Sequence, residues 1–186
     1  TPLTDVEIEY VPVSAPGNLA VRTYAGRVHK MARLSDDVMQ VLIRPDGNER
    51  IRYYAGQYIN IILDDGDKRS FSFATAPHDP AYEDRLGGAV RGGVRFPQTG
   101  ASGANESAPV PFDGTLIELQ IRWIKDGKFT THVFTRMKEG DTVRFEGPLG
   151  SFFLREDSVK PIIFVAGATG FAPVKSMVEH AFRAGF

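Results

Sequence analysis

Hydrophobic and polar residues alternate in several short stretches of the chain, and this pattern predicts β-strands. Residues 116–124 give the clearest case, because every second side chain is apolar. The apolar set is Ile117, Leu119, Ile121 and Trp123, and the polar set between them is Glu118, Gln120 and Arg122. We therefore expect the first set to face a core and the second set to face away from it.

Further stretches have strand-like patterns that end at turn-forming residues. They are residues 21–34, 38–43, 58–63, 69–75 and 142–145. One short helix is predicted over residues 131–137, because Val133, Phe134 and Met137 recur at helical spacing. Thr130 is expected to be its N-cap. Together with residues 116–124, these elements predict a mainly β fold, a six-stranded antiparallel barrel with one short helix.

The pattern changes near Lys160. Residues 162–165 form an unbroken apolar run, which is typical of a parallel strand buried on both faces. An amphipathic helix follows, and Gly185 is a suitable C-cap. The apolar positions of this helix are Val174, Met177, Val178, Ala181 and Phe182. This is the first β–α unit of an α/β nucleotide-binding domain.

One strand and one helix cannot cover the apolar faces of both. We therefore expect this nucleotide-binding domain to be truncated and the chain to be a fragment of a longer protein. The strand at residues 162–165 and the apolar helix positions that include Val174, Met177 and Phe182 would then lack partners. Such an end is expected to fray, to aggregate or to lean on the barrel.

Residues 80–113 differ from the rest of the chain. They are rich in Gly, Ala, Ser and Pro and show little apolar periodicity, so we expect a long flexible insertion. The expected division is a linker at residues 1–20, a barrel at 21–156 that contains the 80–113 insertion, and the start of the nucleotide-binding domain at 160–186.

Composition narrows the possible functions. The formal net charge of −1 gives no electrostatic sign of a nucleic-acid or anionic-membrane partner. No apolar run approaches the length of a membrane span, and we expect a cytoplasmic location. The chain has no cysteine, which excludes disulfides, a thiolate nucleophile and an iron–sulfur cluster held by this chain. No metal site is expected.

The first motif with chemical meaning is Arg69-Ser70-Phe71-Ser72. A flavin needs a cation for its phosphate, an apolar surface for its ring and a small donor near the reactive N5 edge. Arg69 offers a donor fork, Phe71 a ring face, and Ser72 a hydroxyl and an amide. Taken by itself, however, the tetrapeptide also fits an ordinary strand with one exposed Arg and one buried Phe.

Three glycine-containing turns follow. In DGKFTT at residues 126–131, free amides at a helix N-terminus are able to bind pyrophosphate, although a plain turn fits as well. GPLGSFF at residues 147–153 is either a flavin-contacting turn or an inter-domain linker. GATGFAP at residues 167–173 joins the predicted strand to the helix, where glycine allows close approach of a dinucleotide, and Pro173 suits a first helical turn. Strand–glycine–helix junctions of this kind occur in many α/β folds.

In this order, the motifs resemble the flavin-binding barrel of the ferredoxin–NADP reductase superfamily. Within it, the chain is similar to the ferredoxin-fused branch that includes CDP-6-deoxy-Δ3,4-glucoseen reductase and NAD(P)H–flavin reductase. The resembling stretches include AGRVHKMARLSDDVMQVLIRP, YAGQYINIIL, KRSFSFATAPHD, LIELQIRWIKDGKFTTHVF and RFEGPLGSFFLREDS. They cover nearly all of the chain except residues 80–113.

This resemblance implies roles for individual residues. Arg69 would bind the flavin phosphate, Phe71 would stack on the ring where the family usually has Tyr, and Ser72 would face N5. Thr169 would lie nearest the nicotinamide, so Ser72 and Thr169 are the implied catalytic residues. The implied cofactor-binding set is Arg69, Ser70, Phe71, Ser72, Gly127, Lys128, Phe129, Thr130, Gly150, Ser151, Gly167, Thr169, Gly170 and Pro173.

The resemblance also implies an oxidoreductase that moves electrons from NAD(P)H through FAD to a [2Fe–2S] centre. That centre would lie on a missing upstream ferredoxin domain of the same chain, and a downstream enzyme would accept the electrons. The fragment itself is expected to be inactive. One alternative is a reductase component of an oxygenase system, and another is a flavin-binding fragment without turnover.

The sequence departs from the family at three places. Ala168 stands where the family commonly has Gly, residues 80–113 lengthen a connection that is otherwise short, and most of the nucleotide-binding domain is absent.

Overall fold

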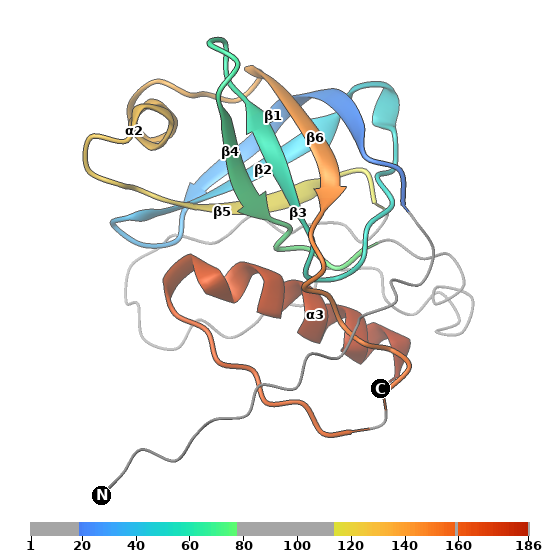
Figure 1. Cartoon of the computed structure of the whole chain (residues 1–186). Coiled ribbons are helices and arrows are strands. Elements are labelled where there is room, and N and C mark those ends of the chain that lie inside the picture. Colours follow the sequence, from blue (N-terminus) through green and yellow to red (C-terminus); the bar gives the residue numbers. More distant parts are fainter. Residues whose placement is uncertain (1–18, 78–113, 159, 186) are drawn as a thin grey trace, which may run out of the picture.

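A computed structural model describes residues 19–77, 114–158 and 160–185. The strands are β1 (Arg22–Arg33), β2 (Val38–Pro45), β3 (Tyr58–Ile62), β4 (Lys68–Ser72), β5 (Ile117–Arg122) and β6 (Thr142–Leu149). Neighbouring strands are all antiparallel, in the order β4-β3-β6-β1-β2-β5. The mainly β fold with six antiparallel strands is therefore confirmed (Figure 1).

The sheet closes into a barrel where β4 and β5 meet. Phe73, directly after β4, forms an antiparallel bridge with Leu119 of β5. The Ala74 amide donates a hydrogen bond of 2.9 Å to the Glu118 carbonyl. We call this contact, made by residues 73–74 and 118–119, the seam. It matters because it joins the strand of the Arg69–Ser72 motif to the strand that leads to the short helix.

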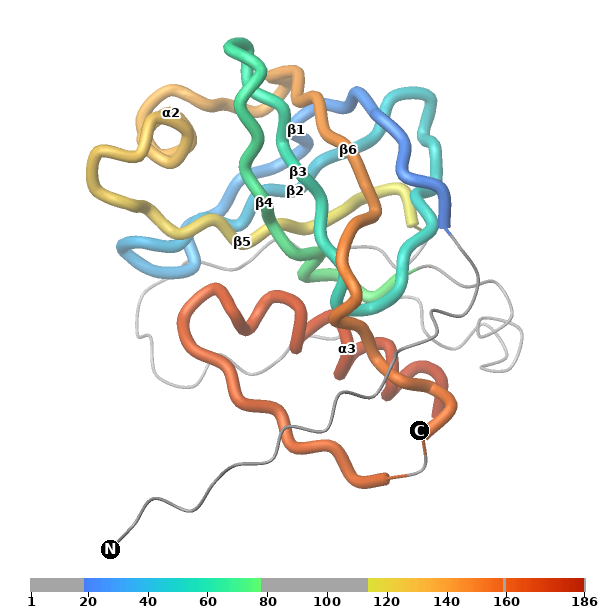
Figure 2. The backbone as a smooth tube through the Cα atoms, viewed as in Figure 1, coloured from blue at the N-terminus to red at the C-terminus, as the bar shows by residue number. Residues whose placement is uncertain are grey.

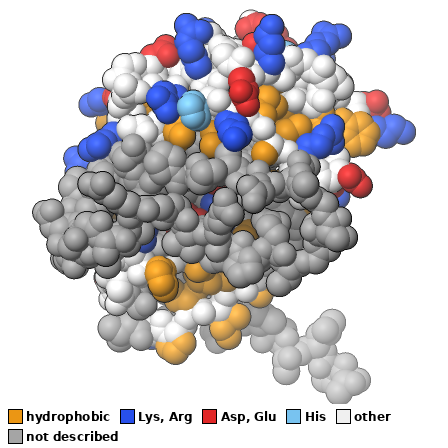
Figure 3. Space-filling view, turned by 180° about the vertical axis from the view of Figure 1, so that it is seen from behind, with side chains coloured by type: hydrophobic (Ala, Val, Ile, Leu, Met, Phe, Trp, Pro, Cys, Tyr) orange, Lys and Arg blue, Asp and Glu red, His pale blue; other side chains and the backbone are white. Residues whose placement is uncertain are grey.

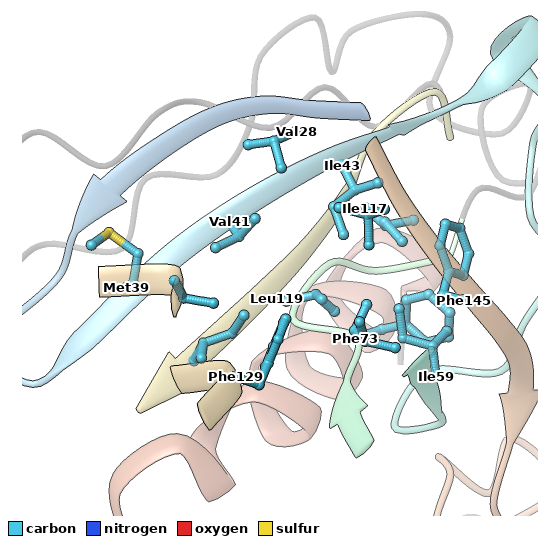
Figure 4. Close-up of a cluster of buried hydrophobic side chains, with 14 of the residues drawn as sticks. Val28, Met39, Val41, Ile43, Ile59, Phe73, Ile117, Leu119, Phe129 and Phe145 are labelled. Carbon is cyan, nitrogen blue, oxygen red and sulfur yellow. The ribbon is translucent and has the colours of Figure 1, made fainter. Parts of the chain in front are cut away.

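The inside of the barrel is filled with large apolar side chains. Phe73, Leu119, Ile59 and Phe145 are all fully buried there. The helix α2 (Lys128–Thr135) adds Phe129 to the same cluster, as Figure 4 shows. Because burying one such side chain is worth about 1.5–3 kcal/mol, this core fixes the barrel on which the candidate site is built.

The helix α2 begins earlier than the sequence predicted. It runs from Lys128 to Thr135 with Gly127 as its N-cap, not over residues 131–137. Thr130 is therefore not the cap, which corrects that expectation. Its hydroxyl lies inside the first turn and accepts a hydrogen bond of 3.1 Å from the Ile124 amide. A Cβ on Gly127 would lie 2.6 Å from the Thr130 Oγ1, so this turn requires glycine.

The predicted strand at residues 162–165 is wrong. These residues pair with no strand in the part of the chain that the structure describes. Ile163 and Val165 are about nine-tenths exposed. The two outer strands of the sheet, β4 and β5, are joined to each other at the seam, and residues 162–165 form no ladder with either of them. Phe164 alone of the run packs partly against a small cluster formed by Ala55, Leu154 and Met177.

The helix that follows, α3 (Phe171–Ala184), lies against one end of the barrel (Figures 1 and 2). The expectation that this end leans on the barrel is confirmed, as is Gly185 as a left-handed C-cap, with φ of 79°. The expectation that the apolar positions lack partners is wrong for Val174 and Met177, which are buried. It holds for Phe182, which is three-quarters exposed.

Charged and hydrophobic side chains gather on different parts of the surface. Figure 3 shows Lys and Arg side chains, with Asp and Glu among them, over the upper part of the rear face, and hydrophobic side chains over the lower part. The exposed large hydrophobic residues of the C-terminal segment are Ile162, Ile163, Val165, Phe171 and Phe182. The linker expected at residues 1–20 and the insertion expected at 80–113 lie almost wholly outside the described residues and stay predictions.

Candidate functional site

The structure brings the Arg69–Ser72 motif and the start of α2 together. The rings of Phe71 on β4 and Phe129 in the first turn of α2 have centroids 5.5 Å apart and are tilted by 45°. Phe71 is only partly buried, at the edge of the core cluster. The two segments are more than fifty residues apart in sequence, and the seam is what makes them neighbours.

Alternation along β4 divides the motif between two faces. Ser70 lies opposite Asn60 of β3 and donates its hydroxyl hydrogen to the Asn60 side chain at 2.7 Å. Arg69 and Phe71 lie on the other face of the strand. The Arg69 guanidinium donates to Asp67 at 3.1 Å and to the Lys68 carbonyl at 2.8 Å, and it is 42% exposed. An exposed pair of this kind is worth at most about 1 kcal/mol, so Arg69 can exchange Asp67 for a stronger anion.

The N-terminus of α2 has features that suit an anion. No side chain caps it, and its first turn contains no acidic residue. The first amides of a helix lack partners inside the helix, and they carry the positive end of its dipole. Lys128, at the first helical position, is exposed and adds a charge. Together with Arg69, this turn offers the donors that a pyrophosphate requires.

The turn at Gly150 and Ser151 lies next to the motif through Tyr58. Tyr58 of β3 pairs with Ser72 of β4 on one side and with Leu149 of β6 on the other. Gly150 has φ of +93°, and a Cβ there would lie 2.7 Å from the Tyr58 ring. Gln57 fixes the turn by donating to the Gly150 carbonyl at 2.9 Å. The glycine is thus required by packing and by backbone conformation.

The turn at Gly167–Gly170 is less closely packed than the turn at Gly150. It contains the short 3₁₀ helix η2 (Ala168–Gly170), which leads directly into α3 and lies beside β5. Gly167 has φ of −121° and Gly170 has φ of −61°; apart from their chain neighbours, no atom of the described residues lies within 4 Å of where a Cβ would stand at either. Neither packing against the described residues nor backbone strain therefore requires glycine at these two positions, and the open positions would leave room for a ligand.

Ala168 is the exception in this turn, because its φ of 48° is left-handed. That conformation is costly for alanine and free for glycine. We expect Ala168→Gly to raise the free energy of unfolding by up to about 1 kcal/mol, after allowing for the greater freedom of glycine in the unfolded chain. Urea unfolding measures this change. The control is Ala166→Gly, since Ala166 is not among the described residues with positive φ; equal effects of the two substitutions would contradict the strain argument.

Sequence reasoning missed a polar junction between the barrel and α3. Glu118 lies on the face of β5 that was expected to point away from the core, yet α3 covers it and leaves it 1% exposed. Lys175 of α3 lies 2.8 Å from Glu118 and 3.0 Å from Glu179. Burial lowers the pKa of Lys175, but the two carboxylates outweigh it and raise that pKa, so the ammonium stays charged. Lys175 and Glu179 are an i,i+4 pair on α3, but no local pattern signals that the pair is buried against Glu118, which is far away in sequence.

Tyr53 belongs to the same junction. Its hydroxyl lies 2.9 Å from the Thr75 hydroxyl and 3.0 Å from the Ala76 carbonyl, and its ring stacks on Phe73 at 3.8 Å. Burial raises the pKa of Tyr53 well above its ordinary value of 10.0. The unfolded chain therefore loses this proton near pH 10, while the folded chain keeps it.

Stability should consequently fall as the pH rises above about 10, since the unfolded state then binds fewer protons than the folded state. We expect Tyr53→Phe to cost about 1 kcal/mol at neutral pH and to make the alkaline fall shallower. The measurement is the free energy of unfolding between about pH 8 and about pH 11. Parallel curves for the variant and the parent would show that Tyr53 does not carry the effect.

Two other kinds of site receive no support. Among the described residues, no group of His, Asp and Glu is arranged to hold a metal ion. None of the helices in the described ranges has the length and hydrophobicity needed to cross a membrane.

Comparison with known proteins agrees with the motifs. Residues 111–154 match the oxidoreductase FAD-binding domain family. The chain is 32% identical over 176 residues to CDP-6-deoxy-L-threo-D-glycero-4-hexulose-3-dehydrase reductase of Yersinia pestis, covering 95% of this chain and 43% of the relative. It is 32% identical over 160 residues to reductase component 1 of terephthalate 1,2-dioxygenase of Comamonas, covering 86% of this chain and 37% of the relative. The chain thus spans about two fifths of the length of these relatives.

Solved structures show the same fold. A cytochrome P450 reductase of Amycolatopsis superposes with a TM-score of 0.64 at 23% identity, over 89% of this chain and 40% of that one. A phthalate dioxygenase reductase, described as a modular structure for electron transfer from pyridine nucleotides to [2Fe–2S], superposes with a TM-score of 0.64 at 14% identity, over 88% of this chain and 41% of that one. The resemblance predicted from the motifs is confirmed.

Proposed function

We propose, from the premise that this chain carries an FAD-binding oxidoreductase domain of the ferredoxin reductase type, that it binds FAD between β4 and α2. The observation that carries the proposal is the contact between Phe71 and Phe129. It joins the arginine-bearing strand to an uncapped helix N-terminus that holds no acidic residue in its first turn. A dinucleotide needs both an apolar surface and a cluster of anion-binding donors, and this arrangement offers both.

Each residue of the site would make a different kind of contact with the cofactor. Arg69 would neutralise phosphate with its donor fork, assisted by the first amides of α2 and by Lys128. Phe71 would present its ring to the isoalloxazine. The Ser72 side chain lies on the face of β4 opposite to Phe71, so Ser72 would face N5 through its backbone amide at the end of the strand. Gly150 and Ser151 would place backbone groups against the cofactor from the far side of Tyr58. FAD, when bound, supplies the conversion between two-electron and one-electron transfer.

The nucleotide would approach at η2. Gly167 and Gly170 leave open space above the turn, and Pro173 lies in the first turn of α3. Thr169, between the glycines, would lie nearest the nicotinamide and orient it with its hydroxyl. We propose that residues 160–186 are the start of an NAD(P)-binding domain and that NAD(P)H is the electron donor.

The activity of the whole protein is proposed from its relatives, which are more than twice as long as this chain. We propose a reductase similar to the CDP-hexulose dehydrase reductases. In the whole protein, an upstream ferredoxin domain would carry a [2Fe–2S] centre, and a downstream enzyme would accept the electrons in the cytoplasm. A reductase component of an oxygenase system is the second candidate, supported by the 32% identity to the terephthalate dioxygenase component.

The test separates flavin binding from turnover. We expect the chain of residues 1–186 to hold FAD, seen as bound visible absorbance, and to show negligible NAD(P)H oxidation with a soluble acceptor. The full-length protein is expected to show rapid oxidation with the same acceptor. Rapid oxidation by residues 1–186 would mean that the nucleotide site is misplaced, and absence of any flavin binding would refute the proposal itself.

A further inference from the structure

Three charged side chains are buried between the barrel and α3. The Lys175 ammonium lies 2.8 Å from the Glu118 carboxylate and 3.0 Å from the Glu179 carboxylate, and it also donates to the Ala74 carbonyl at 2.7 Å. The side chains of Lys175, Glu118 and Glu179 are 16%, 2% and 4% exposed. An ammonium has three donors, and each of them has an acceptor here. We call Glu118, Lys175 and Glu179 the charge cluster.

Attaching a helix through a buried charge cluster carries a cost in desolvation free energy. Removing charges from water is costly in proteins, and apolar residues of similar volume often stabilise a protein as well or better. The cluster therefore contributes directional contacts more than stability. Because the acceptors of Lys175 come from β5, from α3 itself and from the chain after β4, they fix both the rotation and the distance of α3 against the barrel.

The residues that bond to α3 in and around the charge cluster lie next to the two segments proposed to hold ligands. Ala74, whose carbonyl accepts from Lys175, is two residues after Ser72. Thr75 accepts a hydrogen bond from Ser176, and the Ala76 amide donates to Glu179 at 3.2 Å. At the other side, Lys175 follows η2 closely, and η2 continues into α3 without a break. The cluster thus connects the continuation of the flavin strand to the base of the nucleotide turn.

We propose that the charge cluster is a positioning device that holds the Gly167–Gly170 turn at a fixed place relative to the end of β4. This inference rests on the proposed function, in which β4 holds the flavin and the turn holds the nicotinamide. Hydride transfer demands reacting atoms about 3–3.5 Å apart, so a small rotation of α3 would misplace one ring over the other. In this arrangement the cluster residues would act on the two sites through the position of α3.

A spin-label distance measurement tests this proposal on the chain itself. The chain has no cysteine, so Thr169→Cys in η2 and Asp64→Cys in the exposed turn between β3 and β4 give two unique labelling sites. We expect one narrow distance distribution in this doubly labelled parent. Lys175→Met should remove the narrow component while the thermal unfolding of the barrel, followed by circular dichroism, is retained.

Matched variants separate positioning from general stability. Lys175→Arg keeps the charge and offers a donor fork for both carboxylates, so it should restore the narrow distribution. Lys30→Met removes an exposed lysine on β1 and should leave the distribution unchanged. Should Lys175→Met fail to fold, Glu179→Gln, which keeps the size of the side chain and an acceptor for Ala76, gives the same readout.

An unchanged narrow distribution in Lys175→Met, or in Glu179→Gln where that variant is used, would overturn the proposal. A loss of the narrow component that Lys175→Arg does not restore would also overturn it, because the contact would then depend on lysine packing alone. These distances are measured without FAD, so failure here leaves flavin binding untouched. Failure of flavin binding would in turn leave the distances as they are.

Discussion

Replacing Arg69 by alanine should weaken FAD binding about 10- to 150-fold, the loss expected for a charge-assisted hydrogen bond of about 1.5–3 kcal/mol. The guanidinium is on the same face of β4 as Phe71, and its present partner Asp67 is exposed and easily replaced. The free energy of unfolding should change little, because Arg69 is 42% exposed and carries little packing. A fluorescence titration of the apoprotein with FAD measures the affinity.

Lys68→Ala is the matched control for this substitution. Lys68 precedes Arg69 on the same strand but points to the opposite face, where it pairs with Glu146 at 2.8 Å. It should therefore leave FAD affinity unchanged within the error of the titration. Equal losses for the two variants would indicate a general electrostatic effect, and no loss for Arg69→Ala would remove Arg69 from the site.

Replacing Gly56 by alanine should destabilise the fold by about 3 kcal/mol or more, the sum of a strained backbone and an overpacked contact. Gly56 has φ of +107°, and a Cβ there would lie 2.2 Å from the Met177 Cε and 2.6 Å from the Phe152 carbonyl oxygen. Met177 is a flexible side chain and is able to move, but the backbone of Phe152 is not. The substitution should displace α3 as well as strain the barrel.

Gly66→Ala separates the two contributions to that loss. Gly66 also has positive φ, of +84°, but beyond its chain neighbours none of the residues that the structure describes comes within 4 Å of where its Cβ would stand. It should cost only the backbone strain, about 1–2 kcal/mol. Urea unfolding of both variants gives the comparison, and equal losses would show that the contact of Gly56 with α3 is unimportant.

The barrel could be predicted because its information is local. Most strands have an apolar pattern that is visible in sequence, and most of the turns that end them contain glycine or proline. Even so, β6 is longer than predicted, reaching Leu149 instead of residue 145. Its last residues pair with β1 and β3, and that pairing is a property of the closed sheet rather than of the segment.

The errors at the C-terminal end have one cause. The apolar run at residues 162–165 has the composition of a buried strand, but composition cannot supply a partner, and the described residues pair no strand with it. The face of α3 was likewise judged by its apolar positions, whereas Ser176 and Glu179 are buried and Phe182 is exposed. Ser176 and Glu179 of α3 are buried against Thr75 and Ala76, and Lys175 pairs with Glu118. These partners lie far from the helix in sequence, so the helical pattern alone cannot reveal them.

The candidate site shows the same contrast between what local sequence patterns reveal and what depends on long-range packing. The motif residues could be proposed from sequence because the residue types that suit a flavin, and a glycine turn before a helix, are recognisable in a short stretch. Their assembly was not, since the approach of Phe71 to Phe129 depends on the seam at Phe73 and Leu119. The boundary of α2 also changed the candidate site. Because the helix starts at Lys128 and not at residue 131, its free amides belong to the first residues after Gly127.

The most direct test of the central claim is the affinity of the purified chain for FAD compared with riboflavin. Both carry the same isoalloxazine ring, but only FAD has the pyrophosphate that Arg69 and the first turn of α2 are proposed to bind. We predict that FAD binds at least about tenfold more tightly than riboflavin, since one charge-assisted hydrogen bond is worth that much. Equal affinities, or no binding of FAD, would contradict the proposal that β4 and α2 form a flavin-dinucleotide site.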